Sequence, residues 1–253
     1  MQIKFLKRFS INLILFCIAI LVWENHSLLK PTAEKLEKLS LDYRYINYMP
    51  KHEPSKEIVF IDIDDQSLTS LNERLGRWPW NREVISNALE YVEQGSPKMV
   101  LLDILFSEND RNNPEKDKHL AQTVANYKNV SFALSFENFE GVKADRLPAS
   151  QTPFSISIEN YNEKPNKYYL SFTKPFSPLW ENLNHIHVVN AVKDSDGLFR
   201  FTPIFFEYNS ELYPSLTLKA VSQYLENPQF KLEDHQLIIK NNSEKRFIIP
   251  LDA

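Results

Sequence analysis

Residues 58–108 read IVFIDIDDQSLTSLNERLGRWPWNREVISNALEYVEQGSPKMVLLDILFSE, and this stretch decides the fold class. The opening IVFIDID is a short apolar run rich in β-branched residues, which is typical of a buried strand. Asn81 can then cap a helix with apolar residues on one stripe, which Gly95 and Pro97 end. The run 99–102 indicates a second buried strand. Strand, helix and strand at this spacing predict a βαβ unit with parallel strands.

The ends of these two strands carry the first candidates for a binding site. Asp62 and Asp64 end the first run, and Asp103 follows the second. Open α/β sheets bind their ligands near the carboxyl ends of the strands. We therefore expect the three carboxylates to lie close together at one edge of the sheet.

Length and composition limit the class of protein. The chain has 253 residues, of which 43% are hydrophobic and 25% charged, so it can form one large domain or two small ones. The formal net charge is -4 and the sequence pI is about 5.9. The basic surface of a nucleic-acid-binding protein is therefore missing, and we expect no nucleic-acid partner.

The N-terminal segment predicts a membrane anchor. Residues 1–8 contain three basic residues and no acidic one, and residues 9–23 (FSINLILFCIAILVW) carry no charge. Such a run can serve as a short transmembrane helix, with its basic end in the cytoplasm and residues after about 24 outside. We expect residues 1–26 to anchor the chain in a bacterial inner membrane. A cleavable signal peptide is the alternative, although no small-residue cleavage site follows.

Cys17 is the only cysteine, so one chain can form neither a disulfide nor a cysteine-based metal site. Phe16 precedes it, where a lipoprotein signal would need a small residue. Cys17 is therefore expected to face lipid or a neighbouring helix.

Residues 31–45 predict a helix after the anchor. Its apolar residues recur along one face, and they are Leu36, Leu39, Tyr43 and Ile46. We expect this helix to connect the membrane to the domain, and we expect a homodimer through the anchor and this helix.

The rest of the chain predicts further α/β elements and then antiparallel pairing. Residues 115–127 indicate a helix and 130–136 a third parallel strand, whereas 137–167 are mostly loop with a strand at 154–158. The DSDG turn (194–197) predicts a hairpin between 185–192 and 198–208. Tyr213-Pro214 opens a helix to about Leu225, and 237–239 with 246–249 form a closing hairpin. The predicted class is mixed α/β (α+β): a parallel βαβ core sheet, then an antiparallel hairpin region, preceded by one transmembrane helix.

Asp62-Ile63-Asp64 is the best enzymatic candidate. Haloacid-dehalogenase-type phosphotransferases use such an Asp-x-Asp, but they place Thr or Val two residues later, where this chain has Gln66. The alternative is that these carboxylates cap the following loop. We therefore expect no catalytic residue.

Three other sequence patterns could indicate a binding site, but each also has a purely structural explanation. Aligned as a calcium loop, the DSDG segment puts Val192 and Pro203 at ligand positions, so that interpretation fails. His185 and His187 share a strand face, but no third metal ligand is identifiable, and no metal or cofactor is expected. The Trp78-Pro79-Trp80 segment either stacks on a ligand or packs in the core.

Taken in order, the motifs of the chain resemble one family. These motifs are LDYRYI (41–46), IVFIDIDDQSL (58–68), LGRWPWNR (75–82), VLLDILFSE (100–108) leading to DKHLA (117–121), DSDGLFR (194–200) and YPSL (213–216). Together they resemble the type-2 CHASE domain, the cyclase- and histidine-kinase-associated sensory extracellular domain of bacterial transmembrane receptors. The resemblance runs from about Leu41 to the last residue.

The resemblance implies an extracytoplasmic sensor at 27–253 that relays a stimulus to a cytoplasmic cyclase or kinase not present in this chain. It also implies later spans, so the chain is expected to be truncated. The stimulus is an unknown small molecule or protein. The candidate ligand-binding residues are Asp62, Asp64, Trp78, Trp80, Arg82 and Asp103. An aspartate-dependent phosphate-chemistry enzyme and a structural periplasmic interaction module are the alternatives.

Overall fold

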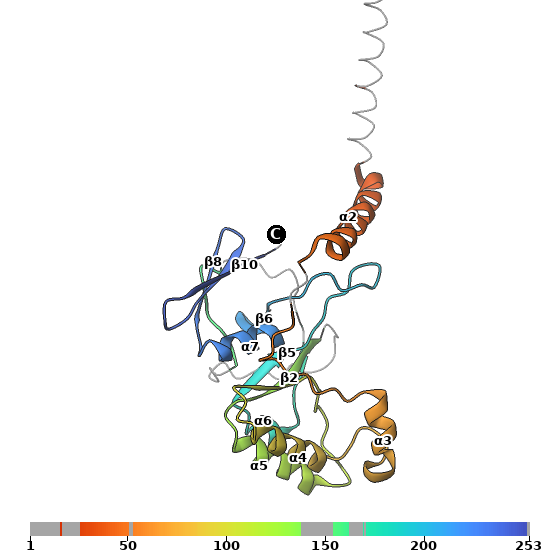
Figure 1. Ribbon diagram of the computed structural model, residues 1–253, viewed down its shortest axis with the longest axis vertical. Coiled ribbons are helices and arrows are strands. Elements are labelled where there is room, and N and C mark those ends of the chain that lie inside the picture. Colours follow the sequence, from red (N-terminus) through yellow and green to blue (C-terminus); the bar gives the residue numbers. More distant parts are fainter. Residues whose placement is uncertain are drawn as a thin grey trace, which may run out of the picture. The chain divides into compact units, whose positions relative to one another are not determined.

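The computed structural model describes residues 16, 26–50, 53–137, 154–161, 169 and 171–251 (Figure 1). The chain forms two compact units, Met1–Asp62 and Ile63–Ala253.

The first unit contains the long helix α2, His26–Tyr48. It confirms the helix predicted at 31–45 and extends it at both ends, with Pro31 inside the helix. The predicted anchor at 9–23 lies outside the described residues apart from Phe16, which is helical. Within the described ranges, no helix combines the length and the apolar character that crossing a membrane requires.

The strand predicted at 58–64 is wrong. These residues form no strand, and the side chains from Ile58 to Ile61 are between 64% and 84% exposed. A strand needs a neighbour that takes its backbone hydrogen bonds, and an apolar run alone cannot show that such a neighbour exists. The only described backbone bond of this kind here is local, from the amide of Ile58 to the carbonyl of Ser55 (3.4 Å).

The second unit is built on a parallel sheet. Its strands run in the order β1, β2, β5, and both neighbours of β2 are parallel to it. The short strand β4 adds to the far end of β2 in antiparallel direction. The strands are β1 (Val100–Leu102), β2 (Val130–Glu137), β4 (Ser171–Thr173) and β5 (His185–Val188). The predicted parallel pairing of 99–102 with 130–136 is thereby confirmed, with α5 (Pro114–Ala125) as the crossover helix.

Four helices accompany this sheet: α3 (Asp65–Leu75), α4 (Arg82–Glu93), α5 (Pro114–Ala125) and α6 (Ser177–Trp180). The predicted helices at 81–95 and 115–127 are confirmed as α4 and α5. The side chain of Asn81 accepts a hydrogen bond from the amide of Glu83 at 2.9 Å, as a helix cap does. α4, α5 and α6 lie together on one side of β2 and β5, whereas α7 (Leu216–Tyr224) lies on the other (Figure 1).

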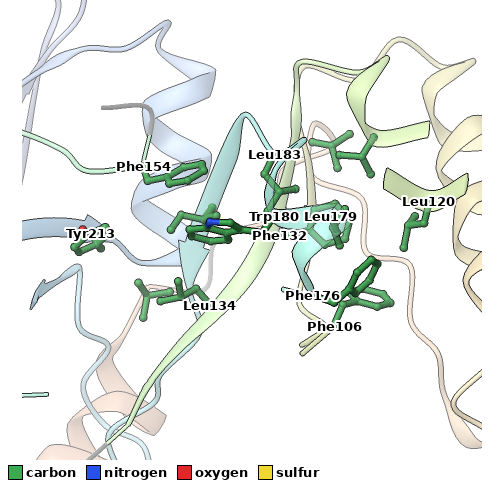
Figure 2. Packing of buried hydrophobic residues seen from close by; sticks show 14 of the residues in the cluster. Phe106, Leu120, Phe132, Leu134, Phe154, Phe176, Leu179, Trp180, Leu183 and Tyr213 are labelled. Carbon is green, nitrogen blue, oxygen red and sulfur yellow. The ribbon is translucent and has the colours of Figure 1, made fainter. Parts of the chain in front are cut away.

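The main core forms where these helices meet the sheet. Phe132 and Leu134 of β2 are fully buried and lie among side chains of the segment around α6, including Leu179 and Trp180 (Figure 2). α5 contributes Leu120, also fully buried. Burying a large apolar side chain stabilises a fold by about 1.5–3 kcal/mol, so this cluster is the main source of stability of the unit.

The C-terminal part is mostly antiparallel, as predicted, but with different partners, and one short strand at 158–159 pairs in parallel. β6 (Phe205–Tyr208) pairs with β7 (Glu211–Pro214), and the last sheet has the order β10-β9-β8-β3. Its strands are β3 (Ile158–Glu159), β8 (Gln229–Glu233), β9 (Gln236–Lys240) and β10 (Arg246–Pro250). The closing hairpin is confirmed as β9 and β10, which β8 extends.

In this region one strand pairing was predicted wrongly, and one predicted helix is confirmed as α7 but begins later than predicted. The DSDG segment does turn, with the amide of Gly197 donating to the carbonyl of Asp194 at 2.9 Å, but β5 pairs in parallel with β2 instead of with the segment after the turn. Tyr213-Pro214 belongs to β7, and Ser215 caps the next helix, α7 (Leu216–Tyr224). The choice of partner strand for β5 is not encoded in the residues of the local turn. The side chains of Leu218, Phe230 and Leu237 join in a second core that links α7 to the last sheet.

Candidate functional site

The six residues predicted to bind a ligand are divided between the two units. Asp62 is exposed and ends the first unit, whereas Asp64, Trp78, Trp80, Arg82 and Asp103 belong to the second. Asp103 follows β1 and is exposed. In the described part, no hydrogen bond or ion pair links Asp103 to the other five, so each residue is considered in its own surroundings.

Asp64 caps the helix α3. Its Oδ1 accepts hydrogen bonds from the hydroxyl of Ser67 at 2.6 Å and from the amide of Ser67 at 2.8 Å. Together these bonds, the hydroxyl's first, lower the pKa of Asp64 below its ordinary value. The alternative that these carboxylates cap a neighbouring segment is therefore confirmed for Asp64, because one of its oxygens is already committed.

The two tryptophans contact each other at the start of α4. Their rings are 5.3 Å apart at an angle of 79°, an edge-to-face arrangement. Trp80 is 7% exposed, and its Nε1 donates to the carbonyl of Gly76 at 3.2 Å. Trp78 is only half-buried. Trp80 thus packs in the core, and Trp78 is the one of the two that a ligand could reach.

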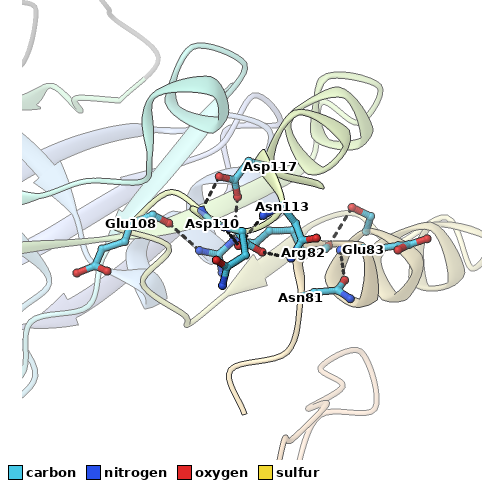
Figure 3. Close-up of polar contacts among 9 residues, drawn as sticks. Asn81, Arg82, Glu83, Glu108, Asp110, Asn113 and Asp117 are labelled. Atoms are coloured by element: carbon cyan, nitrogen blue, oxygen red, sulfur yellow. Dashed lines mark hydrogen bonds and ion pairs between the residues drawn. The ribbon is translucent and has the colours of Figure 1, made fainter. Parts of the chain in front are cut away.

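Arg82 is the centre of a buried polar network (Figure 3). Its Nε lies 3.2 Å from Oδ1 of Asp117, whose side chain is 1% exposed, and its Nη2 donates to the carbonyl of Glu108 at 2.8 Å. The guanidinium lies over the ring of Phe106, 4.7 Å from its centroid. The other oxygen of Asp117 accepts from the amide of Asp110 at 2.7 Å. These contacts fasten the loop after β1 to both α4 and α5.

Asp117 was not among the sequence candidates, although its spacing contained the signal. Asp117 precedes the buried Leu120, Ala121 and Val124 by three, four and seven residues. This spacing places Asp117 on the buried stripe of α5. A carboxylate on such a stripe needs a cationic partner, and Arg82 is that partner.

The other face of the parallel sheet carries a polar cluster. Nδ1 of His187 lies 2.9 Å from the hydroxyl of Ser131, and both side chains are fully buried. Burial, and secondly the charge of Lys219, lower the pKa values of His185 and His187 to about 4. Lys219 of α7 is 4% exposed, and burial lowers its pKa to about 8. The prediction that the two histidines share a face agrees with this arrangement. Over the described ranges, no group of three or more His, Cys, Asp or Glu residues could hold a metal ion.

An open cavity of about 420 Å³ lies beside the β6–β7 hairpin. Its lining includes two glutamates and three residues of the segment before β3, and none of the six predicted residues. The hydroxyl of Tyr161 donates to Glu207 Oε2 at 3.1 Å, and that of Tyr213 donates to Glu211 Oε2 at 2.7 Å. Sequence reasoning missed this cavity, because strands far apart in the chain form it.

The DSDG segment is held by ion pairs. Nη1 of Arg200 lies 2.7 Å from Oδ2 of Asp194, and Nη2 lies 2.8 Å from Oδ2 of Asp196. The side chain of Arg200 is 6% exposed. The carboxylates of this turn therefore bind the arginine that follows them, which agrees with the rejection of a calcium loop.

Together these features define a mixed α/β domain whose charged residues serve mainly to hold loops. A family model described as the CHASE2 domain matches residues 13–252. The chain belongs to this family, which is one of sensory extracellular domains. No curated protein and no solved structure matches the chain.

Proposed function

We propose that this chain is a membrane-anchored extracytoplasmic sensor that detects a stimulus and relays it across a bacterial inner membrane to a cytoplasmic cyclase or kinase. The match of the CHASE2 model to residues 13–252 is the observation that carries the proposal. A ligand can act in such a domain only by binding one conformation better than another. The proposal assigns no catalytic residue to the chain.

Trp78 and Asp103 are the proposed ligand contacts of the predicted set, with Asp62 as a further candidate. Trp78 precedes Arg82 by four residues, and Asp103 precedes Phe106 by three, so both are close in sequence to residues of the Arg82 network, which supports them as contacts. Trp80, Arg82 and Asp64 then act as positioning residues. Preorganised contacts of this kind reduce the cost of ordering a binding site.

The test is a thermal-shift screen of small metabolites and peptides on the full chain in detergent, followed by titration of any hit. We expect the combined Trp78→Ala and Asp103→Asn variant to weaken binding by at least tenfold. Glu207→Gln, in the separate cavity of about 420 Å³, is the matched control. Unchanged binding in the first variant with a loss in the second would move the site to that cavity.

The relay is proposed to pass through α2. This helix follows the predicted anchor directly, so a change in the sensor that turns or shifts α2 would reach the membrane. Its exposed apolar stripe supports pairing with α2 of a second copy.

A further inference from the structure

The two faces of the parallel sheet differ in polarity. In the register of β2 and β5, Phe132 pairs with Ile186 and Leu134 with Val188, and these four side chains belong to the main core. The alternate rows pair Ser131 with His185 and Ala133 with His187. Side chains alternate between the faces of a strand, so both histidines and Ser131 face away from the apolar core.

The helix α7 packs on β5 and carries Lys219, whose charge acts on both histidines. The fold therefore places a buried lysine beside two imidazoles. β7 also packs on β5 and carries Glu211, whose carboxylate accepts the hydrogen bond of Tyr213. The backbones of Leu102 and Lys128 are the other groups that act on the rings, and they favour protonation only weakly.

Each of the two histidines has one buried ring nitrogen that lacks, among the described residues, a well-placed hydrogen-bond acceptor for a second proton. Among the described groups, Nε2 of His187 and Nδ1 of His185 are buried and have no hydrogen-bond partner of normal geometry. A neutral imidazole tolerates this, but a protonated imidazole has two N–H donors that both require acceptors. Protonation would also place a new positive charge beside Lys219.

We propose that His185 and His187 form a proton-binding site, and that their protonation in an acidic medium releases α7 from β5. Acid is then a stimulus of this domain. Because α7 shares the second core with the last sheet, its release would also free that sheet from the parallel one. The use of this switch as a signal rests on the sensory function proposed above, whereas the opening itself does not.

The direction of the effect follows from linkage. A histidine with a folded pKa of about 4 and an exposed value of 6.5 binds protons more tightly in the open state. Opening is therefore favoured as the pH falls below 6.5, and the effect reaches its limit below 4. At pH 5, His187 alone favours the open state by about 20-fold relative to pH 7. His185 adds less, because water partly reaches it.

The test is hydrogen–deuterium exchange of the full chain at pH 7.5 and pH 5.0, with exchange times corrected for intrinsic rates. We expect the amides of α7 to lose at least tenfold in protection at pH 5.0 while those of α5 keep theirs. His185→Gln with His187→Gln should abolish this response, since glutamine stays neutral. His235→Gln, at an exposed histidine, is the matched control and should respond like the wild type.

Unchanged protection of α7 in the wild type would overturn the proposal, as would an equal loss in α5, which would indicate global unfolding. A full response in the double glutamine variant would overturn it too. If that variant does not fold at pH 7.5, Lys219→Met provides the test. Removal of the neighbouring charge brings the histidine pKa values closer to 6.5, so the acid response must shrink. Opening of α7 in acid in a chain whose α2 does not respond to acid would contradict the proposed relay and leave the switch intact.

Discussion

At the scale of single residues, charge in this domain is used to hold chain segments together. Asp64 caps α3, Arg82 binds Asp117, and Arg200 binds the carboxylates of its own turn. The sequence indicates where these residues are but not which of them are committed to such contacts. A carboxylate after a strand has the same local sequence pattern whether it binds a ligand or accepts a hydrogen bond from a backbone amide. The difference depends on atoms from distant parts of the chain.

Breaking the ion pair of Arg82 should be costly. Arg82→Met leaves Asp117 buried without its cation, and removal of one partner of a buried pair typically costs about 3–5 kcal/mol. Urea unfolding of the full chain measures the change. Arg77→Met, at a nearby exposed arginine, should have little effect. A loss below about 1 kcal/mol for Arg82→Met would show that the network contributes little to folding.

Replacing Lys219 should have the opposite effect. Burial lowers its pKa to about 8 from 10.5, so the folded state disfavours the charged form. The wild type therefore gains stability as the pH rises from 8 towards 10.5 and carries a constant penalty below 8. Lys219→Met removes this penalty and should stabilise the fold at pH 7.5 by an amount on the order of 2 kcal/mol.

Urea unfolding at pH 7.5 and pH 10 checks both parts of this prediction. The advantage of Lys219→Met over the wild type should shrink at the higher pH, where the wild-type lysine loses its proton. Lys118→Met, at an exposed lysine, corrects for the titration of other groups. A variant that is destabilised at both pH values would contradict the burial argument.

At the scale of elements, local patterns predicted those helices and strands that pack on the core. α4 and α5 carry apolar stripes and end signals, and β1 and β2 are short apolar runs next to them. The helix α3 was not predicted, although Leu68, Leu71 and Leu75 recur at helical spacing, and the structure buries none of its residues. β5 was found but assigned the wrong partner, since pairing depends on contacts between distant segments. The strand predicted at 58–64 was wrong for the same reason.

Because α3 has no buried residue, its start should depend on its cap. Asp64→Ala removes the acceptor of the Ser67 amide, so the first turn should fray and the amides of α3 should exchange faster in a hydrogen-exchange experiment. Asp64→Asn keeps an acceptor and should preserve the helix. This pair also separates the two roles of Asp64. If the asparagine variant keeps α3 but loses ligand binding, the carboxylate contacts the ligand directly.

At the scale of the whole molecule, the apolar stripe of α2 is the feature that most needs a partner. Leu36, Leu39, Tyr43 and Ile46 are each more than half exposed. Their spacings of three, four and three residues are those of the a and d positions of a two-stranded coiled coil. A helix of this length gains most of its stability from packing. The stripe therefore favours a parallel pair of α2 helices in a dimer.

Disulfide cross-linking in membranes tests this pair. With Cys17 replaced by serine, Leu39→Cys should form an intermolecular disulfide on mild oxidation, because paired d positions bring Cα atoms within the 4.4–6.8 Å that a disulfide requires. Glu34→Cys, on the opposite face of α2, should cross-link far less. If acid moves α2, cross-linking at position 39 should also change between pH 7.5 and pH 5.0. Equal cross-linking at both positions, or none at position 39, would show that α2 does not pair through this stripe, and the relay would then need another path to the membrane.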